Sequence, residues 1–138
     1  MSRSGYSDDY DGNELAMYRG VIASATRGKR GQRFFVDLAG ALDAMPVKRL
    51  IANDLVCDGE VCALGALGQK RGVAGMEDID TYDSDELGKM FDIAHQLAAE
   101  TMYFNDEAGP YGGETPEQRW QRVRSWAAQQ IRQPKETR

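Results

Sequence analysis

The stretch of residues 55–72, "LVCDGEVCALGALGQKRG", contains the strongest turn and packing signals in the chain. Asp58-Gly59 between two apolar pairs is typical of a two-residue β-hairpin turn, which would pair Cys57 with Glu60. The small residues after Cys62 predict a short helix whose glycines let another backbone approach closely. The stretch therefore predicts one short hairpin, within about residues 50–62, that leads directly into a closely packed helix.

Most of the remaining chain carries apolar residues every three or four positions, which is typical of amphipathic helices. Helices are expected over residues 13–26, with Asn13 as cap, over 34–44, and in one central helix over 84–102. A last helix is expected from Thr115, which is followed by Pro116 and Gln118 as in a capping box. The predicted fold class is a mainly α, single-domain bundle of four or five helices with one short β-hairpin.

The length of 138 residues, with 41% hydrophobic residues, fits one domain with an ordinary core. We expect residues 1–12 to be a flexible acidic lead, residues 13–132 to form the helical domain, and residues 133–138 to be a frayed tail. No apolar run is long enough for a membrane span or a signal peptide. A cytoplasmic protein without a membrane partner is therefore expected.

Few residues in the chain offer the chemistry of a metal or catalytic site. Cys57 and Cys62 lack two further zinc ligands, because His95 is the only histidine. Their diagonal positions on the predicted hairpin are poor for a disulfide. No nucleophile motif accompanies His95, whose role is expected to be structural. The sequence thus predicts buried or half-buried packing thiols, no metal, no cofactor and no enzymatic activity.

Charge is segregated along the chain. Residues 76–114 hold eleven acids and one base, whereas the rest of the chain holds sixteen bases and eleven acids. Such asymmetry indicates an electrostatic partner or two halves that attract each other. The candidate acidic interaction surface comprises Glu77, Asp78, Asp80, Asp83, Asp85 and Glu86. The basic connector, a candidate anion or nucleic-acid site, comprises Arg27, Lys29, Arg30 and Arg33.

Two further features have both a structural and a functional interpretation. Trp126 is either a half-exposed interface anchor or an indole at the edge of the core. Asn105 and Asp106 are expected to brace the backbone by local hydrogen bonds, tying the end of the central helix to the small-residue helix. Ligand binding by this pair is the alternative.

Three stretches taken together resemble a known group of proteins. They are "GEVCALGALGQKRG" (59–72), "YFNDEAG" (103–109) and "ETPEQRWQRVRSW" (114–126). The chain resembles small uncharacterised proteins encoded by tailed bacteriophages and prophages, over nearly its whole length. The resemblance implies a phage origin and a location in the bacterial host's cytoplasm. It implies no catalytic residue, because the group has no established activity.

Charge and this resemblance lead to two function hypotheses. The first is a phage accessory protein that binds a host or phage macromolecule without chemistry of its own. Its acidic residues would engage a basic, nucleic-acid-handling protein, as an inhibitor of host defence would. The alternative is direct binding of nucleic acid through the basic connector at residues 27–33.

Overall fold

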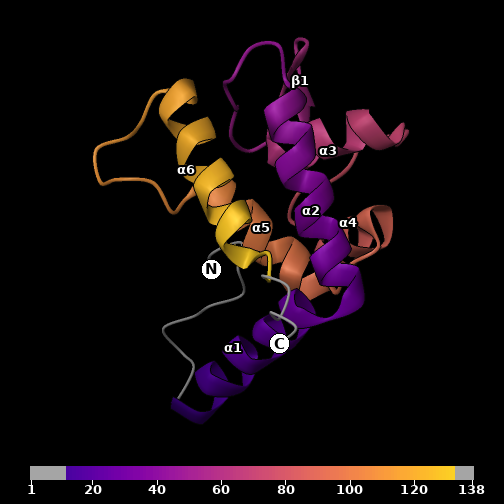
Figure 1. Cartoon of the computed structure of the whole chain (residues 1–138), viewed down its shortest axis with the longest axis vertical. Helices are drawn as coiled ribbons and strands as arrows, with labels where there is room; N and C mark the ends of the chain where they lie inside the picture. Colours follow the sequence, from indigo (N-terminus) through magenta and orange to yellow (C-terminus); the bar gives the residue numbers. More distant parts are fainter. Residues whose placement is uncertain (1–11, 133–138) are drawn as a thin grey trace, which may run out of the picture.

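The structure is a computed structural model, and it describes residues 12–132. The mainly α fold with one short antiparallel hairpin is confirmed (Figure 1). Its elements are α1 (Gly12–Arg27), α2 (Lys29–Ala44), β1 (Val56–Cys57), β2 (Glu60–Val61), α3 (Ala63–Arg71), α4 (Ser84–Phe91), α5 (His95–Asp106) and α6 (Pro116–Gln130). Gly12, expected in the acidic lead, begins α1, which places Asn13 inside the helix rather than at its cap. The rest of the predicted lead and the predicted tail lie outside the described residues.

Within the described residues there are six helices rather than four or five, because the expected central helix is two helices. The break follows Phe91, where Asp92 adopts the left-handed conformation with φ of 56°. The N–H groups of Asp92 and Ile93 both donate to the carbonyl of Gly88. Ile93 is buried, so the chain turns here to bring an apolar residue inward. A Cβ at Gly88 would lie 2.8 Å from the Ile93 carbonyl oxygen, so only glycine permits this turn.

The core is organised around α2, which packs against α3 on one side and α6 on the other (Figure 1). Phe34, Phe35, Leu38 and Leu42 of α2 are fully buried. The α6 indole of Trp120 is buried against the same helix and donates a hydrogen bond to the Leu42 carbonyl at 3.1 Å. Burial of four large apolar side chains on one helix supplies several kcal/mol of stabilisation, at about 2 kcal/mol for each side chain.

The predicted basic connector is a sharp corner between two helices rather than a loop. Only Gly28 separates α1 from α2. A Cβ at Gly31 would lie 1.9 Å from the Ala25 carbonyl oxygen, so this glycine lets the backbones of α1 and α2 cross closely. Lys29, Arg30 and Arg33 therefore lie on the first turns of a rigid helix.

The hairpin has the predicted turn and register. Cys57 pairs with Glu60, and both Asp58 and Gly59 have positive φ, as a two-residue turn of this kind requires. The N–H of Cys62 donates to the Leu55 carbonyl at 3.0 Å. Only Cys62 therefore lies between the end of the hairpin and the start of α3.

The start of α3 is held very close to the hairpin. Cys62 is the N-cap, and its Sγ accepts a hydrogen bond from the N–H of Gly65. A Cβ at Gly65 would lie 2.0 Å from the Leu55 carbonyl oxygen. The predicted close approach of a second backbone to this helix is therefore confirmed.

The loop between α5 and α6 is closed by a carboxylate and two guanidinium groups. Glu114 accepts two hydrogen bonds from Arg122, at 2.7 and 3.0 Å, and lies 3.3 Å from the Nε of Arg119. Arg122 also donates to the carbonyls of Phe104 and Asn105 at the end of α5. The predicted capping box at the start of α6 is present in full.

Candidate functional site

The basic connector continues into a larger basic surface. On α2, positions 30, 33, 37 and 40 lie along one edge, because residues three or four apart share a helix face. Arg30 pairs with Asp92 at 3.2 Å, and Asp37 pairs with Arg71 at 2.7 Å. Both pairs therefore lie in the seam between α2 and its neighbours α3 and α4.

The end of α3 adds a further cation to this seam. A Cβ built at Gly40 would lie 3.1 Å from the Nζ of Lys70, so glycine makes room for the ammonium group against α2. We name this surface the basic stripe; its cations are Arg30, Arg33, Lys70 and Arg71, and the carboxylates of Asp37 and Asp92 lie on it as ion-pair partners. It runs along about ten residues of α2, or roughly 15 Å at 1.5 Å per residue.

Three of the four cations of the basic stripe are available for a ligand at little energetic cost. Within residues 12–132, Arg33 and Lys70 form no ion pair, and both are exposed. The Arg30–Asp92 pair is 60% and 69% exposed, so solvent screens it and Arg30 can exchange partners. Arg27 and Lys29, at the helix corner, are exposed as well.

The first turn of α2 adds positive potential beside these side chains. Its N-cap, Gly28, makes no side-chain cap hydrogen bond, and the turn contains no acidic residue. The first residues of α2 and the N-cap of α5, Ala94, line one hollow of about 280 Å³. Ser24 and Ala25 near the C-terminal end of α1 line the same hollow, so the amide ends of two helices and the carbonyl end of a third meet there.

The acidic candidates lie in the loop before α4 and in its first turn. All six carboxylates, which we name the acidic surface, are on exposed residues. Asp83 caps α4 through the N–H of Glu86, and Asp80 accepts from the N–H of Tyr82. Among residues 12–132 none of the six pairs with an arginine or lysine; Asp85 alone faces a base, His95, at 3.9 Å.

The structure brings one residue from each predicted charged surface together. Arg30 and Asp85 line the same hollow of about 380 Å³, with Lys89, Asp92 and His95. The histidine, whose expected role is structural, is half exposed here rather than packed in the core. Charges of both signs therefore meet at the N-terminal end of the basic stripe.

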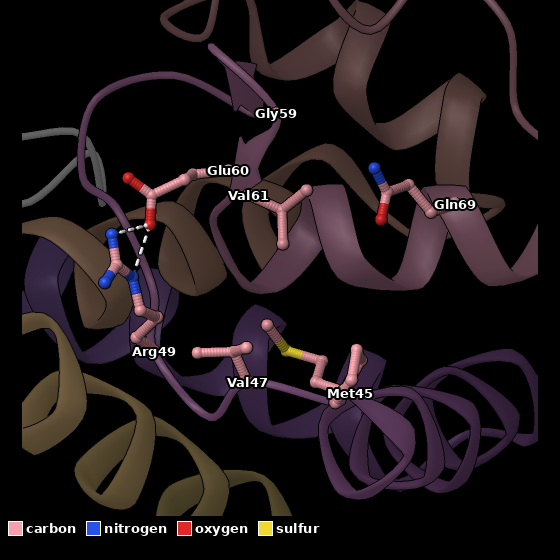
Figure 2. Close-up of a pocket in the computed structure, with 8 residues that line it drawn as sticks. Met45, Val47, Arg49, Gly59, Glu60, Val61 and Gln69 are labelled. Atoms are coloured by element: carbon pink, nitrogen blue, oxygen red, sulfur yellow. Dashed lines mark hydrogen bonds and ion pairs between the residues drawn. The ribbon is translucent and has the colours of Figure 1, made fainter.

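A groove of about 360 Å³ lies at the other end of α2 (Figure 2). Its apolar walls are Met45 and Val47 on one side and Val61 of the hairpin on the other. Arg49 and Glu60 form an ion pair at its rim, and the Gln69 amide of α3 lies above it (Figure 2). The side chains of the groove come from three segments, so the sequence gives no local signal for it.

Asn105 links the end of α5 to two other segments. Its Oδ1 accepts a hydrogen bond from the N–H of Ala63 at 3.0 Å, and its Nδ2 donates to the Ile51 carbonyl at 2.9 Å. Asp106 accepts from this amide and from the N–H of Asn53. Both side chains therefore brace the start of α3 and the segment before the hairpin.

The two cysteines lie in opposite environments. Cys62 is fully buried, and this burial raises the pKa of its thiol to about 12. Cys57 is exposed, which corrects the expectation that both thiols are buried or half buried. The strands are only two residues long, and Cys62 already belongs to the turn into α3, so strand alternation does not place the two side chains on one face. The negative charge of Asp58 raises the pKa of the Cys57 thiol.

Trp126 is half buried and belongs to an aromatic cluster. Its ring stacks on Phe104, with centroids 4.5 Å apart, and meets Phe35 edge to face at 5.2 Å. The indole thus packs against the core through two aromatic contacts, as expected for an indole at the edge of the core.

The described part of the chain contains no group of three or more His, Cys, Asp or Glu side chains placed to hold a metal ion. None of its helices has the length and apolar character needed to span a bilayer. Comparison of the chain with protein-family models, curated proteins and solved structures finds no match. Function is therefore inferred from the chain's own residues.

Proposed function

We propose that this protein acts by binding a macromolecule, and that nucleic acid held along the basic stripe is the partner its geometry supports best. One observation carries this proposal: basic residues that are far apart in the sequence meet along one edge of α2. Lys70 and Arg71 come from α3, whereas Arg30 and Arg33 belong to α2.

Phosphate groups are the ligands that suit such a surface. Arginine and lysine side chains neutralise backbone phosphates and release condensed counterions, which gives sequence-independent affinity. The free amide groups at the first turn of α2 favour an anion at the same end. The Phe34 and Phe35 rings are fully buried, so they do not stack on bases. Contact with the sugar-phosphate backbone is therefore the expected mode of binding.

A salt titration tests this proposal. We expect the affinity for a short blunt DNA duplex to fall between about 50 and 200 mM salt, with a slope of log K against log salt near −3 for about three phosphates neutralised by Arg30, Arg33 and Lys70. Fluorescence anisotropy measures both quantities. An absence of binding, or binding that does not respond to salt, would contradict the proposal.

The second candidate is a phage accessory role in which the acidic surface binds a basic host or phage protein, such as a nucleic-acid-handling protein of host defence. Its exposed carboxylates, which have no lysine or arginine partner within residues 12–132, favour this candidate. Glu77, Asp78 and Glu86 are the members whose side chains neither cap a backbone group nor face His95 among those residues. The resemblance to phage and prophage proteins supports the same role.

Affinity capture with two variants distinguishes the candidates. The second candidate predicts that a protein partner captured from the bacterial host is lost when Glu77→Gln, Asp78→Asn and Glu86→Gln are combined. It predicts that the same partner is retained when Arg33 and Lys70 are changed to Gln. Mass spectrometry after nuclease treatment identifies what is bound. Equal capture by both variants would exclude the acidic surface as the binding site.

A further inference from the structure

We infer that the groove at the C-terminal end of α2 receives an unpaired nucleobase of a nucleic acid bound along the basic stripe. This inference rests on the proposed function, and it names the part of the nucleic acid, an unpaired base, that the groove would bind. It concerns a different set of side chains, those of Met45, Val47, Val61 and Gln69.

The position of the groove is the first reason. The basic stripe ends where Lys70 lies against Gly40, and the next residue back along α3, Gln69, lines the groove. Met45, the C-cap of α2, forms the near wall five residues beyond Gly40, or about 7 Å along the helix axis. A nucleic-acid strand whose phosphates lie along the basic stripe therefore reaches the groove.

The chemistry of the groove is the second reason. A nucleobase has two apolar faces and a polar edge with both donors and acceptors, and proteins bind an unstacked base between apolar side chains with hydrogen bonds to that edge. Val47 is 60% exposed and faces Val61 across the groove (Figure 2). Arg49 and Glu60 pair through one carboxylate oxygen, so the rim offers the remaining donors of Arg49, the second oxygen of Glu60 and the Gln69 amide, which both donates and accepts.

Duplex probes with two kinds of overhang test the inference. One duplex carries a short single-stranded thymidine overhang, and the other carries an overhang of the same length built from abasic nucleotides. Both overhangs supply the same phosphates, so a difference in affinity reports the base alone. We expect the full-length protein to bind the thymidine overhang about fivefold more tightly, which corresponds to about 1 kcal/mol.

Two valine variants locate the effect. Val47→Ser removes an apolar wall, and we expect it to reduce the preference below about twofold while blunt-duplex affinity is retained. Val36→Ser is the matched control, because Val36 is 53% exposed and lies on α2 outside the groove. It should keep the full preference.

The outcomes separate this inference from the proposed function. Equal affinity of the unmodified protein for the two overhangs, with salt-sensitive duplex binding intact, would overturn the inference alone. A preference that survives Val47→Ser would overturn the placement of the base in the groove. Failure to bind any duplex would overturn the proposed function and this inference with it.

Discussion

At the scale of single residues, several glycines determine where backbones meet, and Gly65 is the clearest case. It lies in the first turn of α3, and the Leu55 carbonyl oxygen is 2.0 Å from where its Cβ would be. Gly20, in the middle of α1, has no atom within 4 Å of the same position. Two glycines in helices thus differ in the space around them, and substitution by alanine should act on them in opposite directions.

We expect Gly65→Ala to lower the free energy of unfolding by about 2 to 3 kcal/mol, because the backbone of residue 55 must move. Gly20→Ala should raise it by about 0.5 to 1 kcal/mol, since alanine loses less conformational entropy in a helix. Urea denaturation followed by circular dichroism measures both changes. A stabilisation of similar size in the two variants would show that helix propensity, and not the contact with Leu55, governs position 65.

At the scale of elements, the Glu114 carboxylate joins the end of α5 to the start of α6. Arg122 donates hydrogen bonds to Glu114 and to carbonyls at the end of α5, and Arg119 donates to the Leu50 carbonyl. The hydrogen bonds from Arg122 lower the pKa of Glu114 below its usual value of 4.5. The fold therefore favours the ionised carboxylate, and this stabilisation is present at neutral pH and is lost as the pH falls through the lowered pKa.

We expect Glu114→Gln to lower the free energy of unfolding by about 2 kcal/mol at neutral pH, because a charged, buried hydrogen-bond acceptor is replaced by a neutral amide. The loss should shrink as the pH falls below 4.5, the usual pKa of the group, and should disappear below the lowered pKa, where the unmodified carboxylate is itself protonated. Denaturation at a series of pH values measures this. The control Glu117→Gln, at an exposed glutamate in the first turn of α6, should change stability by less than about 1 kcal/mol.

Parallel stability curves for the unmodified protein and Glu114→Gln across the acidic range would contradict the assignment. They would show that the ionised carboxylate of Glu114 contributes nothing specific to the junction of α5 and α6.

At the scale of the whole molecule, the sequence predicted what local chemistry determines. The Asp58-Gly59 turn requires positive φ at two residues, and the Thr115 cap uses only its own helix, so both are correct from sequence. The turn after Phe91 was missed because the helical spacing continues across it and only tertiary packing of Ile93 decides the break.

The candidate site follows the same distinction. Arg30 and Arg33 are predicted as one cluster because they lie close together in sequence, whereas Lys70 and Arg71 reach the same edge of α2, at Gly40 and Asp37, only through the packing of α3 on α2. The groove at the far end of α2 is assembled from three segments in the same way. Charge counts along the chain predict one acidic and several basic segments, and the fold determines which of these charges share a surface.

We propose that the basic stripe binds nucleic acid through its charge. Paired variants of Arg33 and Lys70 test this binding most directly. We expect Arg33→Gln with Lys70→Gln to weaken binding of a blunt duplex by about tenfold or more and to flatten the salt slope by about 2, since two phosphate contacts are lost. Arg33→Lys with Lys70→Arg preserves both charges and should bind within about twofold of the unmodified protein. Equal affinities and slopes for all three proteins would contradict the claim.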